Sequence, residues 1–123
     1  MSDGLERALS GPWLAARLGV DPVSLEIRRR AGELFAVRPE GSDDWLYPSW
    51  QFDDDLELRP EVVRVLAAAR EEGLRGPALE RLLRRRVGLA EGKTMLDLLR
   101  QGDDEPVLKA IRAAGRRAGP AAT

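Results

Sequence analysis

The chain has 123 residues and a formal net charge of −1, because 21 aspartate and glutamate residues nearly balance 20 lysine and arginine residues. It contains no cysteine and no histidine, which excludes disulfide bonds and removes the commonest metal ligands and the usual acid–base group near neutral pH. The length suits one compact domain or two small helical units, and no apolar stretch is long enough to span a bilayer.

The first residues and the charge balance bear on two classes of protein, exported proteins and proteins that coat DNA. Residues 1–4 have neither the basic nor the apolar region of an export signal, so we expect a cytoplasmic protein with no membrane partner. Proteins that coat DNA without sequence preference are usually strongly basic, and this chain is not. Any DNA binding would therefore depend on locally clustered arginines and on two copies of the chain.

The first two predicted helices lie close to the N-terminus. Residues 3–10 are predicted to form a short helix, because Leu5 and Leu9 lie four residues apart. Ser10 is a candidate N-cap for the second helix, and Pro12 suits its first turn.

The second helix and a third are predicted to form a helix-turn-helix. Gly19 supplies the tight turn, where a left-handed backbone favours glycine. Asp21 is a candidate N-cap for the third helix, with Pro22 at its first position. Leu25 is its expected core contact, and Gly32 suits the position just beyond its end.

Two short strands are predicted next, over residues 34–37 and 45–47, on either side of a polar loop. We interpret Trp45 and Tyr47 as the apolar floor of this hairpin rather than as a platform that stacks on bases. A helix-turn-helix followed by a hairpin is the layout of a winged-helix DNA-binding domain.

Several residues in this segment also follow a known order: Leu14-Ala15, Leu18-Gly19-Val20, Leu25, Gly32 and Leu34-Phe35-Ala36-Val37-Arg38. In this order they resemble the helix-turn-helix and wing of excisionase/MerR-like proteins. The resemblance implies DNA contact by the third helix, which would be the recognition helix, and by the base of the wing. The DNA-binding residues would be Pro22, Val23, Ser24, Glu26, Arg29, Arg30 and Arg38.

The chemistry of these residues supports the assignment only in part. Arginine can bond a guanine edge bidentately, serine can bond a phosphate or a base, and glutamate can accept from cytosine N4. Glu26, however, places a negative charge near the phosphates, and Arg28 stands where such helices often carry an apolar residue. The alternative interpretation is a degenerate winged helix that serves as a scaffold and no longer contacts DNA.

The acidic run Asp53-Asp54-Asp55 is interpreted as part of a solvated linker, because it lacks the alternate spacing and glycine of a calcium loop.

The segment Gly88 to Thr94 approximates a phosphate-binding loop but is one residue short and follows an arginine-rich helix. We interpret it as a turn and a helix cap. No metal site and no cofactor are predicted. No enzymatic activity is predicted either, since no histidine is present to activate a serine.

The rest of the chain is predicted to be helical. Helices are expected to begin at Pro60, at Pro77, at a capping box formed by Thr94 and Asp97, and near Asp104. The predicted fold class is thus mainly α with a small β-hairpin. A winged helix-turn-helix lobe in residues 1–52 is followed by an acidic linker in residues 53–58 and a small helical bundle in residues 59–119.

A second set of motifs runs into this bundle: Tyr47-Pro48, Trp50-Gln51-Phe52, Gly92-Lys93-Thr94, Leu96-Asp97-Leu98-Leu99, Gly102 and Val107. In this order they resemble the Xre/MbcA/ParS-like antitoxin class. The resemblance implies an antitoxin that blocks a partner toxin of the RES type and represses its own operon by binding its own promoter DNA. We expect the chain to bind that DNA as a homodimer. Partner contacts are expected from Leu96, Leu99, Val107 and Ile111. The alternative is a protein–protein adaptor.

Overall fold

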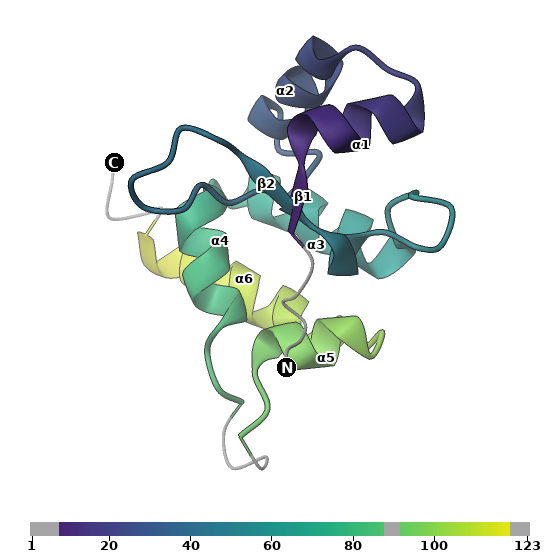
Figure 1. Ribbon diagram of the computed structural model, residues 1–123. Coiled ribbons are helices and arrows are strands. Elements are labelled where there is room, and N and C mark those ends of the chain that lie inside the picture. The colour runs from purple at the N-terminus through teal and green to yellow at the C-terminus, as the bar shows by residue number, and fades with distance from the viewer. Residues whose placement is uncertain (1–7, 88–91, 119–123) are drawn as a thin grey trace. The chain divides into compact units, whose positions relative to one another are not determined.

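The structure is a computed structural model that describes residues 8–87 and 92–118 (Figure 1). In chain order the elements are β1 (Ala8–Ser10), α1 (Gly11–Leu18), α2 (Pro22–Arg30), β2 (Leu46–Pro48), the 3-10 turn η2 (Ser49–Gln51), α3 (Pro60–Glu71), α4 (Gly76–Leu83), α5 (Met95–Arg100) and α6 (Glu105–Ala118). The chain divides into two compact units, the first ending at Arg59 and the second beginning at Pro60. The predicted fold class is confirmed, since the described residues are mainly helical with a small antiparallel sheet.

Helices α1 and α2 begin at the predicted caps. The backbone N–H of Trp13 donates to Ser10 Oγ at 3.2 Å, and the N–H of Val23 donates to Asp21 Oδ1 at 2.9 Å. Each bond satisfies one of the N–H groups that an α-helix leaves unpaired at its start.

Within the described ranges, four helices end in the same way, at a glycine with positive φ followed by a residue that bonds back into the helix. At the end of α2, Gly32 has φ 80°, and the N–H of Glu33 donates to the carbonyl of Arg28 at 2.9 Å. This arrangement pairs carbonyls that the helix would otherwise leave free. The glycines at the ends of α1, α2, α3 and α5 are Gly19, Gly32, Gly73 and Gly102, and the first two were predicted.

The strand pairing differs from the prediction. Residues 8–10, predicted to be helical, form β1, which pairs antiparallel with β2 and sets Leu9 opposite Tyr47. Residues 3–7 of the predicted helix lie outside the described residues. The predicted strand over residues 34–37 is reduced to one bridge, in which Val37 and Leu46 exchange hydrogen bonds of 2.9 and 2.8 Å. The backbone groups of β2 form hydrogen bonds with β1, which lies far from β2 in the sequence. Local periodicity cannot predict a pairing between such distant segments.

Gln51 replaces the missing strand partner of the segment that follows α2. Its side chain is 0% exposed, its Oε1 accepts from the N–H of Phe35 at 2.9 Å, and its Nε2 donates to the carbonyl of Phe35 at 2.8 Å. Nε2 also donates to the carbonyl of Pro48 at 3.0 Å. The amide thus satisfies backbone groups that would otherwise be buried without partners.

Residues 53–58, predicted to be a linker, form a compact loop of the first unit. Asp53 Oδ1 accepts from the N–H groups of Asp55 and Glu57 at 2.8 and 3.0 Å, and Phe52 bridges to Leu58. The side-chain oxygen organises the turn in the way that Asx turns do. Among the described residues, no group of acidic side chains has a geometry that could hold a metal ion.

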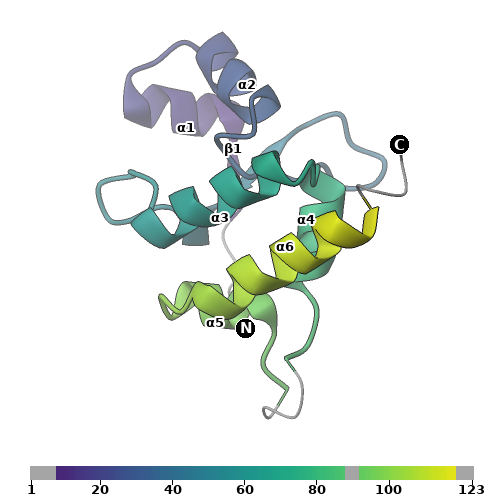
Figure 2. The ribbon, with the colours of Figure 1, turned by 180° about the vertical axis from the view of Figure 1, so that it is seen from behind.

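The second unit is built from α3 to α6. Figure 2 shows α6 lying along α3 and crossing α4 and α5. The apolar faces of these helices are buried, among them the side chains of Val62, Leu66, Leu79 and Leu83. The predicted capping box is present at the start of α5, where the side chains of Thr94 and Asp97 each accept from the other's backbone N–H. None of the helices in the described ranges is long and apolar enough to cross a membrane.

An ion pair joins the residue before α6 to α3. Arg64 Nε donates to Asp104 Oδ2 at 2.6 Å, and this hydrogen bond raises the pKa of the Arg64 guanidinium.

Residues 88–91 of the segment that approximates a phosphate-binding loop lie outside the described residues.

We predict that Gln51→Leu lowers the free energy of unfolding by roughly 2–4 kcal/mol, because it leaves both peptide groups of Phe35 buried without partners. Urea denaturation followed by circular dichroism measures the change. Gln101→Leu, at an exposed glutamine, is the matched control and should have little effect. Equal stability of the two variants would contradict the role assigned to Gln51.

Candidate nucleic-acid interface

Helix α2 presents its outer face to solvent. Leu25 is 1% exposed and anchors the helix in the core that contains Leu14, Ala15 and Tyr47. At roughly 100° per residue, the direction opposite Leu25 falls between Val23 and Ile27, with Arg30 beside them. The structure agrees, since Val23 is 59% exposed and Ile27 is 62% exposed.

The wing is the loop over residues 38–45, which the Val37–Leu46 bridge closes. The N–H of Ser42 donates to the carbonyl of Pro39 at 3.0 Å, and the N–H of Asp44 donates to Ser42 Oγ at 3.0 Å. These bonds define a turn at the tip of the wing.

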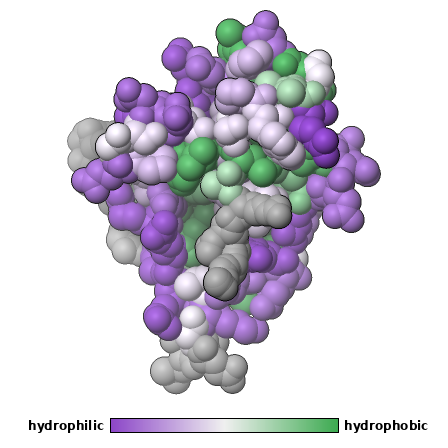
Figure 3. Space-filling model, viewed as in Figure 1, coloured by the Kyte–Doolittle hydropathy of each residue, from purple (hydrophilic) through white to green (hydrophobic). Residues whose placement is uncertain are grey.

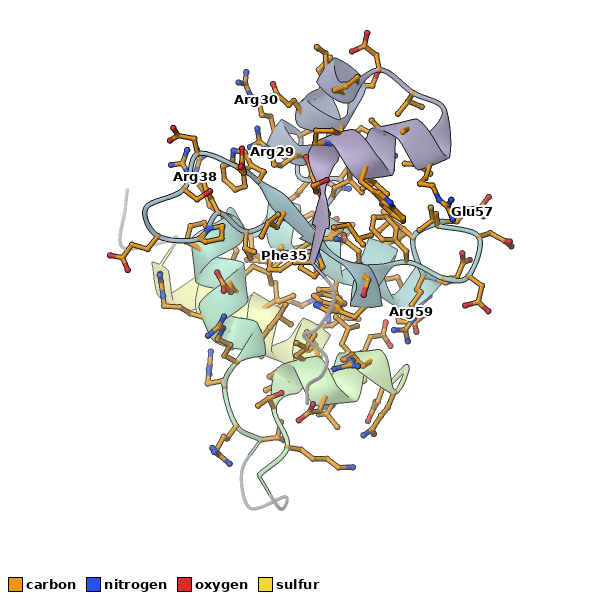
Figure 4. The ribbon with its side chains drawn as sticks, in the orientation of Figure 1. Arg29, Arg30, Phe35, Arg38, Glu57 and Arg59 are labelled. Atoms are coloured by element: carbon orange, nitrogen blue, oxygen red, sulfur yellow. The ribbon has the colours of Figure 1, made fainter. Side chains whose placement is uncertain are left out.

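Two arginines meet at one tryptophan at the base of the wing. The guanidinium carbon of Arg29 lies 4.0 Å from the centre of the Trp45 ring, and that of Arg38 lies 5.2 Å from it. Trp45 in turn packs against the core of the first unit. Figure 4 shows Arg29, Arg30 and Arg38 gathered where the end of α2 approaches the wing. Cation–π attraction thus holds charges from the helix and from the wing together.

Arg29 is partly desolvated by this contact. Its Nε is buried and has no hydrogen-bond partner among the described residues. An unpaired polar atom is costly to bury, and the neighbouring ring face offers only partial compensation. The planar guanidinium keeps further N–H groups on its other edges, so it can still donate to a phosphate or a base.

The other two arginines of α2 form exposed ion pairs. Arg28 Nε lies 3.7 Å from Glu33 Oε1, and Arg30 Nη2 lies 4.0 Å from Glu26 Oε1. Exposed pairs of this length contribute little to stability, so an incoming phosphate could replace the carboxylate at small cost. All three cations also lie in the last turn of α2, where the helix dipole favours them.

The tip of the wing is acidic. Glu40, Asp43 and Asp44 are exposed there, whereas Arg38 and Trp45 lie at its base. Phosphates would repel the tip, so the surface that can accept nucleic acid is limited to α2 and the base of the wing.

The structure brings the predicted DNA-binding residues together only partly. Arg29 and Arg38 share Trp45, and Arg30 lies on the outer face of α2. Pro22, Ser24 and Glu26 are exposed along the same helix. The contact of Trp45 with two arginines was not predicted, because the ring and Arg29 lie 16 residues apart and no local pattern joins them.

The residues predicted to contact a partner protein occupy a different environment. Leu99, Val107 and Ile111 are each 0% exposed and belong to the core of the second unit, while Leu96 is half-buried. In this structure the three buried side chains present no surface to a partner. The same apolar spacing that favours an interface also favours a helical core.

The comparisons with known proteins identify the fold. No protein-family model matches the chain, and no curated protein matches it. Among solved structures, the chain is similar to the NMR structure of Rv2175c, with a TM-score of 0.70 and 21% sequence identity over 94% of this chain and 85% of that chain. At this identity the likeness shows a shared fold, and function has to be argued from the site.

We predict that the Nε–H signal of Arg29 lies upfield of those of the exposed arginines in a ¹H–¹⁵N spectrum, because a proton over an aromatic ring is shielded. Trp45→Leu should remove this shift and lower the free energy of unfolding by about 1–2 kcal/mol. Trp45→Phe keeps a ring and should preserve part of both effects. An Arg29 signal that does not respond to Trp45→Leu would contradict the stacking.

Proposed function

We propose that the chain is a DNA-binding transcriptional regulator, with α2 as the helix that enters the major groove and the base of the wing as a backbone contact. The proposal rests on one observation: the guanidinium groups of Arg29 and Arg38 both lie over the ring of Trp45. One ring joins a cation of the recognition helix to a cation of the wing. Such preorganised charges lose less conformational entropy on binding a phosphate than free arginine side chains lose.

The exposed residues of α2 have chemistry suited to base edges. Arg30 can bond a guanine bidentately, Ser24 can bond a base or a phosphate, and Glu26 can accept from a cytosine amino group. A homodimer would place two such helices about one DNA turn apart, or a multiple of it.

Acidic residues outnumber basic residues in the first 52 residues, so sequence-independent attraction to DNA should be weak. The proposal therefore requires a specific site, and promoter DNA of the chain's own operon is the first candidate.

A second candidate is the protein–protein adaptor, which the exposure of Val23 and Ile27 favours. Neutralisation of a RES-type toxin stays a prediction of the antitoxin resemblance. Because Leu99, Val107 and Ile111 are buried, a toxin interface on the second unit would have to use other residues.

We predict that Arg30→Ala weakens binding to a duplex covering the DNA upstream of the chain's own gene by about 1–3 kcal/mol, as expected for loss of a base contact. Fluorescence anisotropy measures the affinity. Arg112→Ala, at an exposed arginine of the second unit, is the matched control. Absence of binding by the unaltered chain at low salt would overturn the proposal.

Arg38→Ala should act differently, because a backbone contact carries no sequence information. It should weaken binding to all duplexes by a similar factor and reduce the slope of log affinity against log salt by about 1. Titrations at several salt concentrations measure that slope. A loss confined to one sequence would instead identify Arg38 as a base contact.

A further inference from the structure

The most exposed ridge of α2 is apolar. Val23 and Ile27 lie four residues apart on one helix face and are 59% and 62% exposed. Figure 3 shows apolar surface on the part of the first unit that α1 and α2 form. Single exposed apolar residues are common. Here two of them occupy the side opposite the buried Leu25, which is the side that would reach deepest into a groove.

We propose that Val23 and Ile27 read DNA sequence by contacting the C5-methyl groups of thymines in the major groove. This inference rests on the proposed function, and it names the feature of DNA that the site selects. The thymine methyl is the apolar group on the major-groove edge of the base pairs, and aliphatic side chains contact it.

Charge and area favour DNA over a protein as the occupant of this ridge. Arg30 lies on the same face of α2 as Val23 and Ile27, and Arg29 and Arg38 lie beside this face, over the Trp45 ring. The ridge therefore has positive charge on the side that faces the wing. A specific protein interface needs roughly 800 Å² per partner with an apolar centre. Two aliphatic side chains among Ser24, Glu26 and Arg30 fall well short of such a centre, but they match the size of two methyl groups.

The stiffness of the two side chains suits this role. Valine and isoleucine have a strongly preferred χ1 rotamer in a helix, so they lose little freedom on contact. Four residues of helix rise by about 6 Å, and bases along one strand are about 3.4 Å apart. The two side chains would therefore contact thymines that lie one or two base steps apart.

The test uses the full chain and its own selected DNA. Binding sites are first enriched from a random duplex library, and each thymine of the enriched site is then replaced in turn by deoxyuridine, which lacks only the methyl group. We expect a loss of about fourfold in affinity at each contacted thymine, the value of one buried methyl group, and no loss at the other positions.

Serine variants assign the contacts. In Val23→Ser and Ile27→Ser the affinity should become insensitive to deoxyuridine at one position each, and helix propensity changes little in either variant. Val63→Ser, at a valine that is 46% exposed on α3, is the matched control and should keep the full deoxyuridine effect.

The outcomes separate this inference from the proposed function. Enriched sites that bind equally well with thymine and with deoxyuridine at every position would overturn the inference and leave DNA binding intact. A change of oligomeric state in Ile27→Ser, with no deoxyuridine effect in the unaltered chain, would identify the ridge as a protein contact and also overturn it. If no site is enriched, the proposed function fails and the inference fails with it.

Discussion

The paired hydrogen bonds between the Gln51 amide and Phe35 hold the first unit in its shape. The segment after α2 runs through the core without a strand beside it, and buried peptide groups need partners. Gln51 supplies a donor and an acceptor together, as a neighbouring strand would. This contact fixes the path of the chain from Gly32 to Val37, and so it determines where the wing starts relative to α2.

The position of the wing determines which charges can act together. With Val37 paired to Leu46, Arg38 and Trp45 lie at the base of the loop, and Trp45 comes within reach of Arg29. The acidic tip lies further along the loop. A nucleic acid that approached this surface would meet arginines at the base of the wing and an apolar ridge on α2. The local arrangement of the charges, more than their sum, decides what the first unit can bind.

The second unit shows why apolar spacing alone does not identify an interface. Val107 and Ile111 lie four residues apart on α6, Leu99 lies on α5, and the two helices bury these side chains against one another. The fold is shared with Rv2175c along nearly the whole chain, so the bundle is part of the architecture whatever its partners are. A role in binding would have to come from its exposed residues.

The sequence by itself determined the boundaries of most of the helices. Ser10, Asp21 and Thr94 cap helices, and Gly19 and Gly32 end them, because these bonds join residues only two to five positions apart. Tertiary structure decided the rest: the strand β1 in place of a helix, the inclusion of residues 53–58 in the first unit, the Gln51 amide bonds and the stacking of Arg29 on Trp45. Each of these features depends on contacts between residues that only the folded core brings together, or on backbone groups that need a hydrogen-bond partner. The spacing of residue types along the chain carries no record of such contacts.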